Sequence, residues 1–304
     1  MPPALYDAHI HFFSHRFYSL LAAQHGGGAT AETVCAALGW PVPPEDPTEL
    51  AALWVAELDR HGVTGAALLA SLPGDEESVA TAIRAFPHRF AGYFFLNPLV
   101  PGAPERVQRA FAAGLRGICL FPAMHGFSIA GAEAAAVIET AAAQPGAVVF
   151  VHCGILSVGV RKRLGLPSPF DMRFSNPIDV HHVALRHPQL PFIVPHFGAG
   201  YFREALMLAS LCGNVYFDTS SSNNWTRCLT PPPTLEQVFG QALDILGPQR
   251  LLFGTDSSFF PRGWVRPVFE VQCQALASLG LAPADQEAIL GGNLQRLLGF
   301  PQFG

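Results

Sequence analysis

The stretch Tyr6-Asp7-Ala8-His9-Ile10-His11, near the start of the chain, carries two histidines separated by one residue. If this short apolar run is a β-strand, His9 and His11 share a face, because side chains alternate along a strand with a period of two. Two imidazoles held side by side on a rigid strand can supply two ligands of a metal site. They can also be ordinary polar residues near a strand end, so their meaning depends on the rest of the chain.

After this strand the chain alternates between helical and strand-like segments. Eight strands are expected, at residues 6–11, 65–70, 90–96, 115–121, 147–152, 191–196, 214–219 and 250–256. Helices are expected at 30–38, 48–60, 76–86, 104–113, 132–143, 177–186, 201–212, 235–246, 267–279, 283–289 and 292–298. Eight β/α units in about 250 residues or more are typical of a TIM barrel, although an open doubly wound sheet is the alternative.

Two long segments interrupt this alternation. A Gly- and Pro-rich stretch follows the first strand and contains little regular structure beyond a helix at 30–38. A second insertion, at 154–176, follows the fifth strand. Loops of this length in a compact domain are usually functional. The sequence therefore predicts one α/β domain over residues 1–304, a (β/α)8 barrel elaborated after strands one and five.

The composition limits the class of protein. Half of the 304 residues are hydrophobic, 13% are charged, and the mean hydropathy of +0.28 suits strands that are buried on both faces. The net charge of −5 and the lack of a Lys/Arg cluster disfavour nucleic acid as a partner. The six cysteines include no C-x-x-C pair, and the sequence shows no secretory signal and no apolar run that could span a bilayer. These features predict a soluble cytoplasmic protein without a membrane partner.

Polar residues recur where the expected strands end. Besides His9 and His11, the fifth strand runs into His152, the sixth into His196 and the eighth into Asp256. In a barrel the carboxyl ends of all strands meet at one face, where the catalytic groups lie. One such histidine is usually a solvated residue, but several of them with an aspartate suit a divalent metal such as zinc, with a position left for water.

These motifs, taken in order, resemble the metal-dependent amidohydrolase superfamily, and within it the amidohydrolase 2 branch of aminocarboxymuconate-semialdehyde-decarboxylase-like proteins. The resemblance covers nearly the whole chain. It rests on H-x-H at 9–11, H-C-G at 152–154, H-F-G-A-G at 196–200, G-T-D at 254–256 and the closing I-L-G-G-N-L-Q-R-L-L at 289–298.

The resemblance implies a role for each strand-end residue. His9, His11, His152 and Asp256 would bind the metal, zinc first and manganese as an alternative. His196 would act beside the metal water as an acid/base or electrostatic group, and Asp256 could also accept a proton. The resemblance further implies a homo-oligomer, commonly a dimer.

One departure from the two-metal relatives bears on the number of ions. Those relatives carry a lysine on strand four that becomes carboxylated and bridges two metals. Here the comparable place is held by Cys119, and the one lysine of the chain is Lys162, in the loop after strand five. We therefore expect one metal ion per chain. A Cys119 thiolate that bridges two ions is the alternative, but a buried inert thiol is favoured.

Cations in the expected mouth loops point to an anionic substrate. Arg16, after the first strand, and Arg173, in the fifth-strand insertion, have aromatic neighbours that could desolvate them. Arginine offers a bidentate fork to carboxylates, so these two are the predicted contacts to a small carboxylate-bearing substrate. For any single loop arginine a solvated surface charge is the favoured interpretation, and Arg16 and Arg173 are the better candidates among them.

Two reactions suit this shell. In a hydrolase, metal-activated water attacks a lactone or amide while His196 and Asp256 manage protons. In a non-oxidative decarboxylase of an aromatic or muconate-type acid, the metal orients the substrate and an acid protonates the carbon that loses carbon dioxide. The complete water-activating shell favours the hydrolase. A catalytically silent metal-binding barrel is the third and least favoured alternative, because silent relatives usually lose metal ligands.

Overall fold

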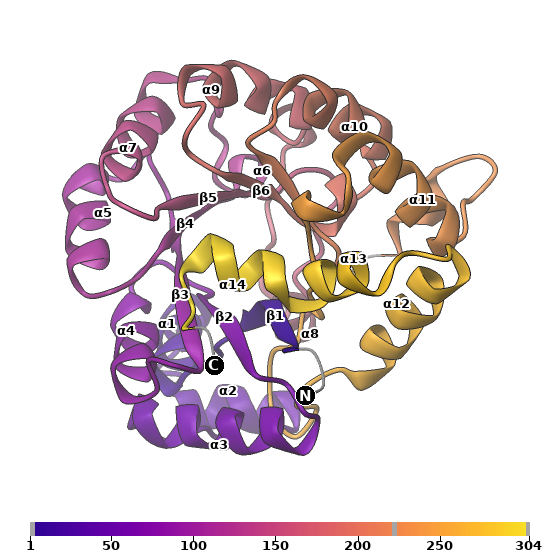
Figure 1. The fold of residues 1–304 in the computed structure, drawn as a ribbon. Coiled ribbons are helices and arrows are strands. Elements are labelled where there is room, and N and C mark those ends of the chain that lie inside the picture. Colours follow the sequence, from indigo (N-terminus) through magenta and orange to yellow (C-terminus); the bar gives the residue numbers. More distant parts are fainter. Residues whose placement is uncertain (1–3, 221–223, 302–304) are drawn as a thin grey trace.

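The computed structural model describes residues 4–220 and 224–301, and its eight parallel strands form one sheet in the order β1 to β8 (Figure 1). The strands are β1 (Tyr6–His11), β2 (Gly65–Ala70), β3 (Phe90–Leu96), β4 (Gly117–Leu120), β5 (Val148–Val151), β6 (Phe192–Val194), β7 (Val215–Asp218) and β8 (Leu251–Leu252). The sheet closes on itself through backbone hydrogen bonds, in which Ala8 N–H donates to Phe253 C=O at 2.8 Å and His11 N–H to Ser257 C=O at 2.8 Å. The predicted TIM barrel is confirmed, and the open sheet is excluded.

Helices surround the barrel between successive strands (Figure 1). They are α3 (Pro47–Arg60), α4 (Glu76–Ala85), α5 (Ala103–Ala112), α7 (Ala132–Ala142), α9 (Val180–Arg186), α10 (Phe202–Leu211), α11 (Leu235–Leu246) and α12 (Arg266–Ser278). The chain ends with α13 (Pro283–Glu287) and α14 (Asn293–Leu298). Leu294 and Leu298 of α14 pack with Tyr6 and the interior of the barrel, so this helix covers the end of the barrel where the strands begin. No helix among the described residues is long and apolar enough to cross a membrane.

The strands are apolar on both faces because each face meets a different hydrophobic layer. In β2, Ala67 and Leu69 belong to the cluster inside the barrel, while Leu68 packs in the layer between the sheet and the helices. Cys119 of β4 lies in the interior cluster as a fully buried free thiol, and burial raises its pKa well above the ordinary value. This location agrees with the inert role that was expected for it.

The stretch after β1 is more regular than its composition suggested. It forms α1 (His15–His25), which was not predicted, before α2 (Ala31–Leu38), which was. Ser14 caps α1 by accepting a hydrogen bond from the N–H of Phe17, and Gly26, with φ of 76°, lies at its C-cap. Gly26 thus ends a helix, and Gly27 and Gly28 lie in the short turn that leads to α2.

A third hydrophobic cluster holds the insertions together at the mouth of the barrel. It joins α1 and α2 to the short helix α8 (Gly159–Arg163), which lies in the insertion after β5. Phe17, Leu21, Val34 and Leu38 pack there with Val160. Because this cluster is separate from the two barrel layers, the inserted segments form a small core of their own over one side of the mouth.

Candidate metal centre

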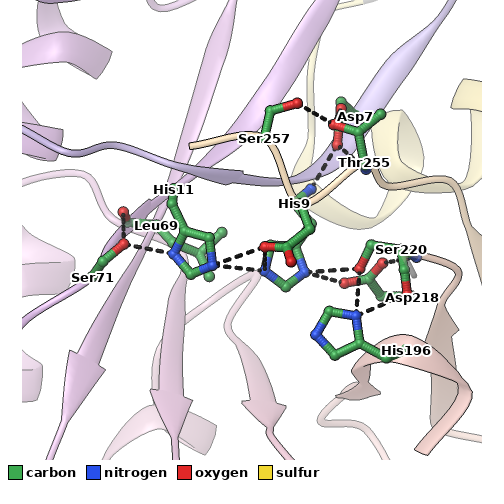
Figure 2. A network of polar contacts seen from close by, with 11 residues as sticks. Asp7, His9, His11, Leu69, Ser71, His196, Asp218, Ser220, Thr255 and Ser257 are labelled. Atoms are coloured by element: carbon green, nitrogen blue, oxygen red, sulfur yellow. Dashed lines mark hydrogen bonds and ion pairs between the residues drawn. The ribbon is translucent and has the colours of Figure 1, made fainter. Parts of the chain in front are cut away.

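The side chains of His9 and His11, both on β1, lie next to each other (Figure 2), and Asp256, which follows β8, lies close to both rings. The Nε2 atoms of His9 and His11 lie 3.3 Å apart, and the Asp256 Oδ1 lies 3.5 Å from the first and 3.0 Å from the second. The donor atoms of these three residues all lie within 4.8 Å of one another. Among the described residues they form the one group of three or more His, Cys, Asp or Glu side chains arranged in this way.

Hydrogen bonds on the far side of each imidazole assign the protons. His9 Nδ1 lies 2.5 Å from Asp218 Oδ2, and His11 Nδ1 lies 2.6 Å from the Ser71 hydroxyl, which itself donates to the carbonyl of Leu69. A carboxylate and an already donating hydroxyl both accept, so each Nδ1 carries a proton. Each Nε2 is therefore the ring nitrogen that faces the Asp256 carboxylate, and in the neutral ring it carries the lone pair that a metal ion would use.

Two imidazole nitrogens and a carboxylate oxygen this close together need a positive charge among them, which a proton on an imidazole or a metal ion can supply. Two imidazole nitrogens and a carboxylate oxygen are ligands that zinc and similar divalent ions take. The orientation of the rings by partners behind them is also the arrangement found around metal-binding histidines. The residues present thus fit a divalent metal ion.

Two further predicted residues lie beside this group. The His196 ring, which follows β6, has its centroid 5.2 Å from that of His9 and 5.5 Å from that of His152. His152 follows β5 but is not part of the tight three-residue group. Its buried Nε2 has no hydrogen-bond partner within the described chain, which is an unfavourable state for a polar atom that nothing contacts. The role of His152 as the fourth ligand stays a prediction.

The electrostatics of the group favour a bound cation. Burial opposes ionisation of Asp256, but the hydrogen bond from His11 and the neighbouring histidines outweigh it and lower the pKa of the carboxyl below its ordinary value. Burial likewise opposes a charge on His9, yet Asp218 and Asp256 raise its pKa to about 9. Burial holds the pKa of His152 well below the ordinary value. The carboxylates are therefore ionised and stabilise a positive charge, which the protonated ring of His9 supplies and which a bound metal ion would supply in its place.

The backbone is strained at the same place. Of the five non-glycine residues with positive φ in the described chain, four are Asp256, at 58°, and His196, Phe197 and Ala199, at 44–55°. Left-handed backbone costs energy in residues other than glycine and is concentrated at functional sites. The turn after β6 is held from outside, because the N–H of Ile155 donates to the Ala199 carbonyl at 2.7 Å. A Cβ on Gly154 would lie 2.2 Å from that carbonyl oxygen, which explains the glycine of the H-C-G motif.

A cavity of about 600 Å³ opens above the group. Its polar floor is formed by His9, His11, His152, His196 and Asp256. Its walls are largely apolar and aromatic, with contributions from Phe13, Phe17, Trp40, Phe95, Phe121 and Phe259. The structure thus brings all the predicted metal-binding and catalytic residues to the floor of one cavity.

The two predicted substrate arginines do not line this cavity. Arg173 is 83% exposed and pairs with Asp171 at 2.5 Å, and Arg16 is exposed on α1. The arginines of the cavity wall are Arg161, Arg163 and Arg262. Arg161 donates to the carbonyl of Pro167, and the Arg163 guanidinium lies 5.1 Å from the centroid of the Trp40 ring.

The residues that orient the histidines were not predicted from the sequence. Asp218 is the last residue of β7, and its side chain is fully buried beneath His9. It is also a polar residue at a strand end, the pattern that singled out His152 and Asp256. The expected strand at 214–219 placed Asp218 inside the strand, which hid the signal. Ser71, just beyond β2, had the same pattern and was also passed over.

Comparisons with known proteins agree with this geometry. A family model described as Amidohydrolase matches residues 6–300. The N-terminal β1 and the closing α14 both lie within the matched region, so the match includes every strand and every predicted site residue.

Solved structures of similar fold cover nearly the whole chain. A protein of Pseudomonas putida described as a 2-pyrone-4,6-dicarboxylic acid hydrolase is 18% identical, with a TM-score of 0.63 and 100% of each chain covered. One of Acinetobacter baumannii with the same description, with citric acid bound, is 15% identical, with a TM-score of 0.61 over 97% of this chain and 99% of that one. An amidohydrolase of Burkholderia multivorans with bound zinc is 18% identical, with a TM-score of 0.63 over 98% of this chain and 100% of that one. At these identities the likeness shows the fold.

One curated relative matches a shorter segment. Protein fluG of Emericella nidulans is 31% identical over 87 residues, which are 29% of this chain. The match spans 10% of the length of fluG. It therefore says little about what the two whole proteins share.

Proposed function

This chain belongs to the amidohydrolase family of enzymes, and on that premise we propose that it is a hydrolase that uses one divalent metal ion per chain. Zinc is the first choice and manganese the alternative. His9, His11 and Asp256 would hold the ion, with His152 as the fourth ligand. The substrate would be a small carboxylate-bearing lactone or amide.

One observation carries this proposal above the others. Two imidazole Nε2 atoms and a carboxylate oxygen converge on the floor of a cavity of about 600 Å³. When bound there, a divalent ion would lower the pKa of a water molecule and polarise a carbonyl oxygen. The carboxyl ends of barrel strands are also where the catalytic groups of this fold lie.

His196 is the residue best placed to move a proton. Its Nδ1 donates to the carbonyl of Ser220 at 2.8 Å, which leaves Nε2 as the acceptor on the side of the cavity that the ring lines. Burial lowers the pKa of His196, so the ring is neutral at pH 7 and able to accept a proton. Asp256, ionised beside it, is a second proton acceptor.

The cavity walls support a small anionic substrate with an apolar body. Aromatic rings exclude water from the polar floor, which strengthens every electrostatic interaction there. Arg161, Arg163 and Arg262 line the wall, and none of them forms an ion pair with a carboxylate among the described residues. Citric acid bound to the Acinetobacter baumannii protein of similar fold accords with a carboxylate ligand.

The aromatic lining keeps one alternative open. Phe95 and Phe121 line the cavity, and their ring centroids lie 4.0 Å apart. An apolar wall of this kind desolvates a carboxylate on an aromatic ring, and desolvation favours the loss of carbon dioxide because charge spreads as the carbon–carbon bond breaks. A metal-dependent decarboxylase of an aromatic or muconate-type acid is therefore the second candidate.

Metal analysis combined with labelled water tests the proposal. The purified protein is expected to contain one zinc or manganese ion per chain by elemental analysis. Turnover of a panel of carboxylated lactones, amides and aromatic acids in H₂¹⁸O is expected to place ¹⁸O in the product without release of carbon dioxide. Carbon dioxide release without ¹⁸O incorporation would establish the decarboxylase instead, and two tightly bound ions would contradict the single-metal site.

A further inference from the structure

The end of β7 contacts two of the site histidines at once (Figure 2). Asp218 Oδ2 lies 2.5 Å from His9 Nδ1, and the main-chain carbonyl of Ser220 lies 2.8 Å from His196 Nδ1. The Ser220 hydroxyl lies between the two rings, 3.1 Å from each Nδ1. Its backbone N–H donates to Asp218 Oδ1 at 2.8 Å, which joins the two contacts into one unit.

We propose that Asp218 is a positioning residue that, together with the Ser220 backbone, sets the tautomer of both His9 and His196. The carboxylate of Asp218 and the carbonyl of Ser220 can only accept hydrogen bonds, so each facing Nδ1 must carry a proton. Each Nε2 is then the nitrogen left for the ion or for a proton in transit. Asp218 touches neither substrate nor ion, and acts through the two rings.

The segment is anchored from behind, so its position is rigid. The Thr219 hydroxyl donates to Gln272 Oε1 of α12 at 2.6 Å, and Gln272 Nε2 donates to the carbonyl of Gly254 at 2.9 Å. The N–H of Thr219 donates to the carbonyl of Leu252 at 2.9 Å. These bonds tie the end of β7 to β8 and to the outer helix, and the side chains of Thr219 and Gln272 are buried.

Gly254 leaves the space that the carboxylate needs. A Cβ at this position would lie 2.6 Å from Asp218 Oδ1, 3.1 Å from the Cβ of His9 and 3.2 Å from the Cβ of Ser220. The glycine of the G-T-D motif therefore has a physical purpose beyond chain flexibility. It allows β8 to approach the unit formed by Asp218 and Ser220 without displacing it.

The variant Asp218→Asn tests the inference with almost no change in shape. The oxygen that accepts from the Ser220 N–H stays an oxygen, so the amide nitrogen faces His9 Nδ1 and donates to it. His9 must then carry its proton on Nε2, the nitrogen directed at the metal site. Zinc affinity, measured by competition with a chromophoric chelator, is expected to fall about 10- to 100-fold. Histidine ¹⁵N NMR of the metal-free variant is expected to show the proton on Nε2 of His9.

A matched control and a second variant separate positioning from general damage. Asp75→Asn changes another buried carboxylate that bonds to Ser14 and to no histidine, so wild-type zinc affinity is expected. Gly254→Ala keeps every polar group but crowds Asp218, and a loss of zinc affinity smaller than that of Asp218→Asn is expected. Thermal unfolding of each variant checks that it folds.

The inference rests on the proposed metal site, but its failure can be distinguished from the failure of the proposed function. Wild-type metal-free protein is expected to show Nδ1 protonated in both His9 and His196 by ¹⁵N NMR, a readout that requires no variant to fold. Nδ1 without a proton in either ring would overturn the inference, as would Asp218→Asn with zinc affinity within about twofold of wild type. Wild-type protein that binds no zinc or manganese would instead overturn the proposed function, and the NMR result would still decide the tautomers.

Discussion

The mouth of the barrel has a strand side, formed by the ends of the strands, and an inserted side, formed by the inserted helices. A buried carboxylate on each side has its pKa shifted in the opposite direction. On the strand side, Asp256 lies among histidines that outweigh burial and lower its pKa. On the inserted side, formed by α1, α2, α8 and the residues that they contact, Asp75 at the N-cap of α4 is fully buried, whereas Asp256 is 16% exposed. The Asp75 oxygens accept from the Ser14 hydroxyl at 2.7 and 2.9 Å, and burial raises the pKa of Asp75 to about 7. Burial alone therefore does not mark a reactive carboxylate. The charge of its partners decides whether a buried carboxylate stays ionised beside a cation or takes up a proton.

The same contrast holds for the cationic side chains. On the strand side, His9 is buried and His11 is 20% exposed, and hydrogen bonds to Asp218 and Ser71 hold the two rings. On the inserted side, Arg161 and Arg163 lie on the small helix α8 and are at least partly exposed to solvent. We infer that the strand side carries the chemistry, while the inserted side recognises the substrate.

The largest expected effect is on the strand side. His11→Ala removes one of the three converging ligands. Changes to residues that only hydrogen-bond a metal ligand already cost about 10- to 100-fold, so loss of a ligand is expected to lower kcat/KM by at least about a thousandfold. Metal content by elemental analysis and turnover of the substrate found in the panel are the measurements. His15→Ala is the matched control, because His15 begins α1 on the inserted side and its near contact is Glu32.

A silent barrel gives a different pair of results. His11→Ala would lose metal while the wild-type protein had no activity to lose against any compound of the panel. Retention of one metal ion per chain in His11→Ala, with activity near that of wild type, would contradict the assignment of the strand side as the metal centre.

The next effect is on stability and arises on the inserted side. A folded-state pKa of about 7 for Asp75, against an ordinary 3.8, means that the folded protein binds more protons than the unfolded chain between these values. The free energy of unfolding therefore falls as pH rises from about 4 to about 7, by up to about 4 kcal/mol from this group. Asp75→Asn cannot ionise, so its stability is expected to depend less steeply on pH over that window.

Urea unfolding at pH 4, 5.5, 7 and 8, in the presence of a chelator, measures this difference. The comparison uses wild type and Asp75→Asn at each pH, so contributions from other groups, including Asp7 with its pKa raised to about 6 by burial, cancel between the two proteins. Parallel curves for the two proteins would show that Ser14 and its surroundings stabilise the ionised form of Asp75 after all.

The two sides of the mouth also differ in how well their site residues can be predicted from the sequence alone. Strand ends follow from local pattern, and the rule that barrel strands place catalytic groups at their carboxyl ends brought His9, His11, His196 and Asp256 to one floor. Asp218 obeys the same rule, but an expected strand end one residue too late concealed it. Its bond to His9 spans 209 positions in the sequence, so no local pattern could reveal that contact.

On the inserted side, local pattern predicts the helices but not which side chains face the cavity. The buried residues of α1 stand at helical spacing, so the signal for this helix was present in the sequence and was passed over, whereas α2 was predicted. Which arginine faces the cavity depends on how these segments pack together, so the choice of Arg16 and Arg173 rested on neighbouring aromatic residues alone. A shift of one or two residues in the path of an inserted segment is enough to turn an arginine side chain from the cavity to solvent.

The smallest expected effect tests this division directly. Arg163 lies on the cavity wall over Trp40, and Trp40 stacks on Phe259 with ring centroids 3.7 Å apart. A hydrogen bond to a charged group contributes about 1.5–3 kcal/mol, so Arg163→Ala is expected to raise KM for a carboxylate substrate about tenfold or more. The kcat should change little, because the guanidinium acts on substrate binding and not on the reacting atoms.

Arg173→Ala is the matched control, since that side chain is 83% exposed and already paired with Asp171. Its KM and kcat are expected to equal those of wild type. Equal increases in KM for the two variants would mean that Arg173 contacts the substrate, as its aromatic neighbours in the sequence suggested. The insertion after β5 would then close over the substrate. A fall in kcat for Arg163→Ala without a change in KM would instead place the inserted side within the chemistry, because an interaction made only in the transition state lowers kcat alone.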